Sequence, residues 1–92
     1  MSVELPFPVT AEIKGVTRAA TFAKLSDALA AIRAGLAQLP LDDDQAGCLA
    51  DRFGEAAAAR IAHQLVEFGA VRAIAYVGIE SAHPIYLCAV AT

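Results

Sequence analysis

The chain has 92 residues, of which 58% are hydrophobic, and a net charge of −3 at neutral pH. This length and composition predict one folded domain over residues 1–92 and exclude a disordered chain. No apolar run approaches the ~20 residues that cross a bilayer, so we expect no membrane partner. Two cysteines cannot build the disulfide framework of a secreted protein, and the first residues lack the features of a signal peptide. We therefore expect a cytoplasmic location.

The negative charge is concentrated in one short segment. Residues 1–41 hold four basic and three acidic side chains, residues 42–55 hold one basic and five acidic, and residues 56–92 hold two of each. The sequence contains no basic patch that would neutralise the phosphates of a nucleic acid. This charge pattern disfavours direct nucleic-acid binding and favours a protein partner with a basic surface.

The beginning of the chain predicts an extended arm followed by a β-hairpin. Residues 1–8 contain two prolines, which cannot donate to a sheet ladder. Apolar and polar residues alternate over residues 9–14, as in a strand with one buried face. Residues 15–16, a glycine and a valine, fit a two-residue hairpin turn, and residues 17–24 are expected to form the returning strand.

A helix is predicted after this hairpin. Ser26 is a favourable N-cap, and Asp27 follows in the first turn, where a negative charge complements the helix dipole. Pro40 ends the helix. We interpret its apolar stripe as a core-packing face, and a short two-stranded coiled coil is the alternative. The stripe consists of Leu25, Leu29, Ile32, Leu36 and Leu39.

A second helix is predicted to begin after Asp42. The spacing of Asp42 and Gln45 is close to that of a capping box, and this helix should extend to about Phe53. Gly54 would break or kink the chain before a third helical stretch over residues 55–68. The pattern leaves open whether these stretches are two helices or one kinked helix. The third stretch is expected to turn four side chains toward the core: Ala58, Ile61, Leu65 and Phe68.

The end of the chain predicts a second hairpin. Residues 70–79 carry apolar side chains at every second position, and residues 84–91 form the next strand after a short connection. The predicted order is therefore ββαααββ. Two hairpins that flank helices indicate an α+β fold, in which two to three helices pack on one face of a four-stranded, mostly antiparallel sheet.

The register of the second hairpin decides which residues the outer face of the sheet exposes. In the preferred register Ile85 and Leu87 face the core, and Tyr76 lies opposite Tyr86 on the outer face. This choice buries branched aliphatic residues and leaves both phenol groups near water. The opposite choice would bury three other residues: Tyr86, Cys88 and Val90.

None of the reactive side chains stands in a known catalytic or metal-binding pattern. His63 and His83 are twenty residues apart, and Cys48 and Cys88 lack the sequence context of a catalytic nucleophile. The glycines do not form a nucleotide-binding motif. We therefore expect no catalytic residue, no metal and no cofactor, and predict that the chain is not an enzyme. A site built from Cys88, His63 or His83 is an alternative.

Two surfaces are candidates for binding a protein partner. The acidic cluster at the second helix would cap and solvate that helix, or would dock on a basic partner. The outer sheet face mixes tyrosine, arginine and aliphatic residues, which are typical of interface anchors, although it would also fit a merely amphipathic face or one covered by the arm. The residues predicted to bind the partner are Asp42, Asp43, Asp44, Asp51, Glu55, Arg72, Tyr76 and Tyr86.

The short length, local acidity and lack of a cofactor motif resemble the profile of small inhibitors encoded by phages and mobile elements, of which anti-CRISPR proteins are one group. The resemblance is one of profile and transfers no functional residue. It implies a non-enzymatic inhibitor whose residues 42–55 cover a basic nucleic-acid-binding surface on a CRISPR effector. Toxin-neutralising immunity proteins share this profile. The alternative from another class is a homodimeric accessory or subunit domain that associates through its outer sheet face.

Overall fold

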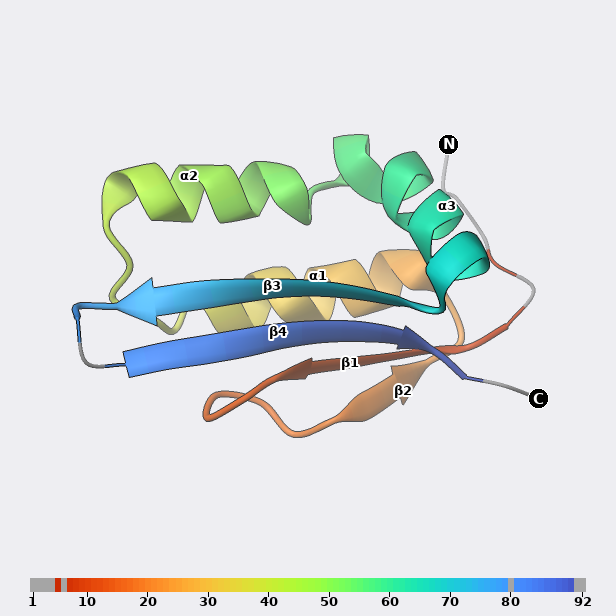
Figure 1. Ribbon diagram of the computed structural model, residues 1–92, viewed down its shortest axis with the longest axis horizontal. Helices are drawn as coiled ribbons and strands as arrows, with labels where there is room; N and C mark the ends of the chain where they lie inside the picture. Colours follow the sequence, from red (N-terminus) through yellow and green to blue (C-terminus); the bar gives the residue numbers. More distant parts are fainter. Residues whose placement is uncertain (1–4, 6, 80, 91–92) are drawn as a thin grey trace.

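The computed structural model describes residues 5, 7–79 and 81–90 and has the α+β fold that the sequence predicts. Its four strands form one antiparallel sheet in the order β2-β1-β4-β3, seen in front of α1 in Figure 1. Most of the arm expected over residues 1–8 lies outside the described residues, but Leu5 and Phe7 pack against the core. The elements are β1 (Val9–Ile13), β2 (Ala20–Phe22), α1 (Leu25–Leu36), α2 (Asp43–Arg52), the 3-10 helix η1 (Glu55–Ala57), α3 (Ala58–Phe68), β3 (Ala70–Val77) and β4 (Ser81–Ala89).

The core is one apolar layer between the sheet and the helices. The predicted stripe of α1 is buried, except that Leu39, beyond the end of the helix, is only partly buried. α1 lies close to β1 because Gly35 has no side chain, and a Cβ there would stand 2.7 Å from Ile13 Cδ1. Burial of each large aliphatic side chain stabilises the fold by ~1.5–3 kcal/mol. The largest buried residues are Phe53, Ile13, Leu25, Leu29, Ile32, Ile61, Leu65, Ile85, Leu87 and Val9.

The start of α1 differs from the prediction. Lys24 is the N-cap residue and its side chain makes no capping hydrogen bond, whereas Ser26 lies inside the first turn. Leu25 is the first helical residue and is 1% exposed. Burial of a leucine is worth ~1.5–3 kcal/mol and a serine cap about 1 kcal/mol, so the apolar stripe decides where the helix begins.

α2 and α3 are separate helices rather than one kinked helix. α2 ends at Arg52, and Gly54 is extended (φ −79°, ψ 170°) before η1 begins. α3 ends at a left-handed residue, Gly69 (φ 78°). Phe68 was expected in the core but is 74% exposed. The reason is that the chain turns into β3 directly after it, so this side chain lies past the packed part of the helix.

The first hairpin is wider than predicted. The expected two-residue turn at residues 15–16 does not form, and residues 14–19 make a loop instead. The strands keep the register that a tight turn would produce, but the returning strand covers only residues 20–22. The Thr17 hydroxyl accepts the Ile13 N–H at 3.0 Å. A side chain therefore replaces the strand partner that the short β2 does not provide.

The second hairpin has a different register from the predicted one. A three-residue connection begins at Gly78, whose φ of 64° suits a tight turn, and β4 starts where the connection was expected to be. Tyr86 therefore lies opposite Arg72, and Tyr76 lies opposite Ala82. The predicted pairing of the two tyrosines is wrong because a short connection lets the ladder extend further toward the turn.

The predicted inward face of β4 is nevertheless correct. The register differs from the predicted one by an even number of residues, and an even shift leaves each side chain on the same face. Ile85 and Leu87 are fully buried, whereas Tyr86 and Cys88 are half-buried on the outer face.

Pro84 stands in β4, a central strand, where its missing N–H leaves the carbonyl of Lys14, the residue after β1, without the usual donor. The Pro84 carbonyl accepts the Lys14 N–H at 2.9 Å. The Lys14 carbonyl cannot bond to residue 84 in return, and instead accepts from His83 Nδ1 at 2.8 Å. The imidazole thus replaces the backbone donor that the proline removes.

His83→Ala should lower the free energy of unfolding by about 1 kcal/mol, because the Lys14 carbonyl loses its donor. In a Pro84→Ala background the cost should shrink, since residue 84 then supplies an N–H to the same carbonyl. Urea denaturation of the four proteins of this double-mutant cycle measures both values.

His63→Ala is the matched control. His63 is exposed on α3, and its Nε2 lies 3.5 Å from the carboxylate of Glu67. Its loss should change the stability by less than about 0.5 kcal/mol. Equal costs of His83→Ala in both backgrounds would show that the imidazole does not substitute for the backbone donor.

Candidate functional site

α2 lies along the free edge of β3 (Figure 1). An edge strand presents unpaired N–H and C=O groups, which invite pairing with other chains. The main-chain groups of the odd-numbered residues on this side of the sheet bond to β4; for example, the Gly69 carbonyl accepts the Ala89 N–H at 2.8 Å. Successive residues of a strand point their main-chain groups in opposite directions, so the even-numbered residues of β3 direct theirs away from β4. Side chains of α2 reach two of the outward residues. The helix therefore covers an edge that would otherwise be open.

Gln45 makes the tightest attachment between α2 and the sheet. Its Oε1 accepts the Tyr76 N–H at 2.5 Å, and its Nε2 donates to the Tyr76 carbonyl at 2.6 Å. The amide thus bonds both main-chain groups of Tyr76, as a neighbouring strand would. The capping box predicted for this helix is only half formed: Asp42 Oδ1 accepts the Gln45 N–H at 2.7 Å, but the Gln45 side chain is used at the sheet edge instead.

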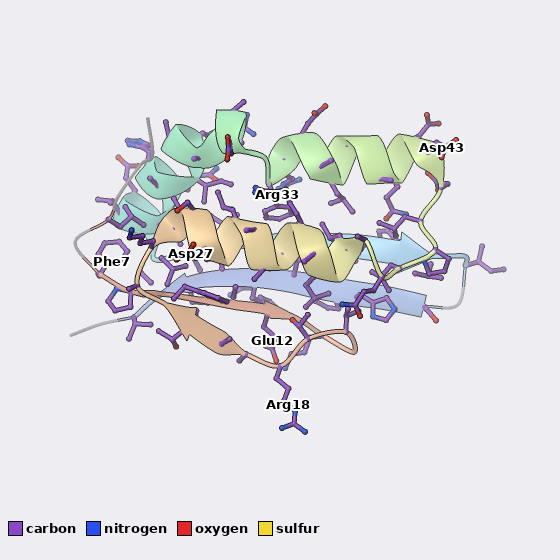
Figure 2. All side chains as sticks on the ribbon, turned by 180° about the vertical axis from the view of Figure 1, so that it is seen from behind. Phe7, Glu12, Arg18, Asp27, Arg33 and Asp43 are labelled. Carbon is purple, nitrogen blue, oxygen red and sulfur yellow. The ribbon has the colours of Figure 1, made fainter. Side chains whose placement is uncertain are left out.

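The second half of α2 is held by buried apolar residues and by arginines. Leu49 and Phe53 are buried in the core. Arg33 of α1 is directed toward α2 in Figure 2, and its Nη1 donates to the Phe53 carbonyl at 2.8 Å. Arg52 Nη2 donates to the Arg72 carbonyl at 3.4 Å, which is a long and weak bond. Few contacts attach α2 to the rest of the fold, so the loss of any one of them should loosen the helix.

The five predicted acidic residues are all exposed and separate into two groups. Asp42, Asp43 and Asp44 lie at the start of α2, where Asp43 projects outward in Figure 2. Asp51 and Glu55 lie near its other end, about 15 Å away for a ten-residue helix. Within the described residues, the ion pairs shorter than 4.0 Å involve other side chains. The acidic groups are thus uncompensated.

The outer face of the sheet, opposite α1, is open to solvent. Ile74 is 46% exposed and Tyr76 is 55% exposed. In the middle of this face Arg72, Tyr86 and Glu12 lie side by side on β3, β4 and β1. A cation, a phenol ring and a carboxylate therefore form one row across three strands.

The Gln45 attachment brings the two predicted surfaces together at one end of the molecule. Asp43 and Asp44 directly precede Gln45, whose amide holds the backbone of Tyr76. The start of α2 accordingly lies beside the end of β3 in Figure 1. Arg72 lies further along the strand, toward the second acidic group. We call the first juxtaposition, Asp42–Asp44 with Ile74 and Tyr76, the composite surface.

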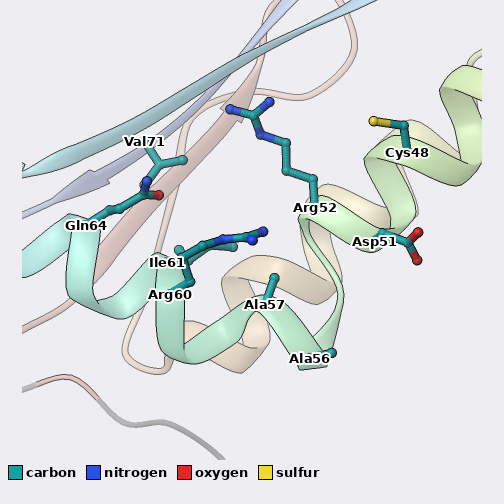
Figure 3. Close-up of a pocket in the computed structure, with 9 residues that line it drawn as sticks. All are labelled: Cys48, Asp51, Arg52, Ala56, Ala57, Arg60, Ile61, Gln64 and Val71. Atoms are coloured by element: carbon teal, nitrogen blue, oxygen red, sulfur yellow. The ribbon is translucent and has the colours of Figure 1, made fainter.

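Sequence reasoning missed a cleft of about 560 Å³ where α2, η1 and α3 meet the first residues of β3 (Figure 3). Its arginines come from two helices that Gly54 separates, so no local spacing relates them. Only the four-residue step from Arg60 to Gln64, which places both on one helix face, was visible in the sequence. The lining residues that matter chemically are Cys48, Arg52, Arg60, Ile61, Gln64 and Val71.

Among the described residues, no group of three His, Cys, Asp or Glu side chains is close enough to hold a metal ion. No helix in the same part of the chain has the length and apolar character needed to cross a membrane. Comparison of the chain with protein-family models, curated proteins and solved structures found no match.

Gln45→Ala should loosen α2 from the sheet edge. The substitution removes both bonds to Tyr76 but keeps the Asp42 cap, which uses the backbone N–H of residue 45. We expect faster hydrogen exchange at the Tyr76 amide and a loss of about 1–2 kcal/mol in the free energy of unfolding. Exchange followed by NMR and urea denaturation measure the two effects.

Two further variants control this prediction. Gln38→Ala changes an exposed glutamine outside α2 and should leave both measurements unchanged. Gly47→Ala adds a methyl group where no atom beyond the neighbouring residues and backbone of the helix itself lies within 4 Å, and should stabilise α2 by about 0.5–1 kcal/mol. Unaltered exchange at Tyr76 in Gln45→Ala would contradict the assignment of α2 as the cover of this edge.

Proposed function

We propose that this chain is a non-enzymatic protein-binding module that docks on a partner with a basic surface. The observation that supports it best is the attachment of Gln45 to Tyr76, which joins uncompensated aspartates to an exposed aromatic strand. Apolar anchors beside unpaired charge are typical of protein interfaces. The composite surface has both components on elements that the two Gln45–Tyr76 hydrogen bonds connect.

The two components contribute differently to binding. Tyr76 and Ile74 supply apolar area, and buried aromatic residues commonly provide most of the affinity at an interface. Asp43 and Asp44 attract a basic partner over distances up to the Debye length, ~8–10 Å at physiological salt, and fix its orientation. The aspartates should therefore govern salt dependence, whereas the tyrosine should govern the dissociation rate.

The class of partner follows from the sign of the charge. Proteins that hold nucleic acids do so through lysine and arginine, which pair with phosphates. A module with an acidic edge competes with phosphate for such a surface, so binding would occlude the nucleic-acid site of the partner. Inhibitors of this kind include the anti-CRISPR proteins whose profile the chain resembles, and toxin-neutralising immunity proteins act on other partners by the same physical means.

The test begins with capture of the partner from a lysate of the organism that encodes the chain, followed by calorimetry on the purified pair. Asp43→Asn/Asp44→Asn should weaken binding by about five- to tenfold at low salt and flatten its salt dependence. Asp42 is retained because its side chain caps α2. Tyr76→Ala should also weaken binding, but without changing the salt dependence.

A matched pair of substitutions controls for net charge. Asp27→Asn/Glu67→Gln also removes two negative charges, but from α1 and α3, away from the composite surface. Its affinity should stay close to that of the natural chain. If both double variants lost the same affinity for the partner, the effect would come from net charge. Unchanged affinity in Asp43→Asn/Asp44→Asn would exclude the composite surface as the binding site.

A second candidate function is self-association through the open sheet face. The row of Arg72, Tyr86 and Glu12 is self-complementary, since a two-fold axis through Tyr86 would place each arginine opposite the glutamate of the other copy. The two phenol rings would then stack near the axis. A closed dimer of this kind fits an accessory or subunit domain.

Size-exclusion chromatography with light scattering tests the dimer. The natural chain should have twice its monomer mass of 9.5 kDa, and Arg72→Glu should reduce the mass to that of the monomer. The charge swap Arg72→Glu/Glu12→Arg should restore the dimer because it restores the opposite charges across the axis. A monomer at all concentrations of the natural chain would exclude this candidate.

A further inference from the structure

The cleft beside α3 is lined by two arginines, Arg52 and Arg60. Among the described residues, no carboxylate forms an ion pair within 4.0 Å of Arg52 or Arg60. Asp51 also lines the cleft, but its carboxylate points away from both guanidinium groups in Figure 3. Arg52 uses one N–H in its 3.4 Å bond to the Arg72 carbonyl, which leaves most of its five donors free.

The wall of the cleft behind these arginines is apolar. Ala57, Ile61 and Val71 line it and are 6%, 2% and 8% exposed. The Gln64 amide of α3 and the Cys48 thiol of α2 also line the cleft (Figure 3). A volume of about 560 Å³ falls within the ~300–1,000 Å³ that is usual for small-molecule sites.

We propose that this cleft binds a small organic anion. Its carboxylate or phosphate group bonds to Arg52 and Arg60, and its apolar part rests on Ile61 and Val71. Guanidinium groups suit this role because their planar pairs of N–H donors match both oxyanions. Gln64 supplies a further donor and acceptor for a polar substituent. Arg52 and Arg60 give the cleft a positive charge that Asp51, which also lines it, offsets only in part.

The surroundings favour a small ligand over a nucleic acid. Asp51 lines the cleft and Glu55 directly precedes Ala56, which also lines it, so a long polyanion that crossed the cleft would meet repulsion on that side. The cleft also lies apart from Tyr76, at the other end of β3. The proposed function and this site therefore rest on different residues, and the failure of one leaves the other intact.

The first test is a titration of the ¹⁵N-labelled chain with four probes: phenyl phosphate, inorganic phosphate, benzoate and benzyl alcohol. The amides of Ile61, Gln64 and Val71 report on the cleft. At least one of the two organic anions should shift these signals and bind about tenfold more tightly than inorganic phosphate, which lacks the apolar part. Benzyl alcohol should not bind. The tighter of phenyl phosphate and benzoate identifies the preferred oxyanion.

A pair of substitutions tests the role of the charge. Arg60→Gln removes one guanidinium from an exposed position on α3. It should lower the affinity of the cleft for the more tightly bound organic anion by about tenfold. Arg18→Gln is the control, because Arg18 is an exposed arginine of the β1–β2 loop that projects away from the helices in Figure 2. The Arg18→Gln variant should bind the anion with unchanged affinity.

Cys48 provides a second, independent measurement. The exposed thiol lines the cleft, so a bound anion should slow its alkylation by iodoacetamide. Cys88 lies on the outer sheet face and serves as the internal reference, whose rate should stay constant. The proposal is overturned by any of three results: no shift of the cleft amides with either organic anion at millimolar concentration, equal binding of benzyl alcohol, or unchanged affinity in Arg60→Gln.

Discussion

The free edge of β3 is the constraint on which the rest of the structure depends. An open antiparallel sheet has two edges, and this one limits the first by making β2 only three residues long. The second edge belongs to β3, which has eight residues and cannot be left unpaired without inviting other strands. α2 covers it with the Gln45 amide at Tyr76 and the Arg52 guanidinium at Arg72. Because α2 follows this edge, its acidic start lies beside the exposed end of β3. Its last turn lines the cleft.

The parts of the fold that depend on near neighbours could be predicted from the sequence. The alternation in β1 and the apolar stripe of α1 each indicate which face of one element is buried. The faces predicted from them are the buried ones. Asp42 caps α2 as its spacing with Gln45 indicates, since the bond spans only three residues. The inward face of β4 was also correct, because the side-chain pattern fixes the face even where the register is wrong.

The rest could not be predicted because it depends on groups far apart in the chain. Gln45 was expected to complete a capping box, but its amide bonds to a strand 31 residues away. Tyr76 and Tyr86 were expected to face each other, and the length of the turn at Gly78 moved them apart. The cleft is lined by both Arg52 and Arg60, which lie on different helices separated by the break at Gly54. Composition and spacing could name the acidic and tyrosine-bearing surfaces, but not that a single side chain joins them.

α2 also connects the two proposed binding surfaces energetically. Its outer start contributes Asp43 and Asp44 to the composite surface, and its last turn contributes Arg52 to the cleft. Leu49 is its only buried helical residue within the described chain, and Gly47 lowers its intrinsic helicity without a packing role. A ligand at either surface would therefore stabilise the same weakly held helix against the sheet edge. Linkage makes any such effect reciprocal: the factor by which cleft occupancy changes affinity at the composite surface equals the factor in the reverse direction.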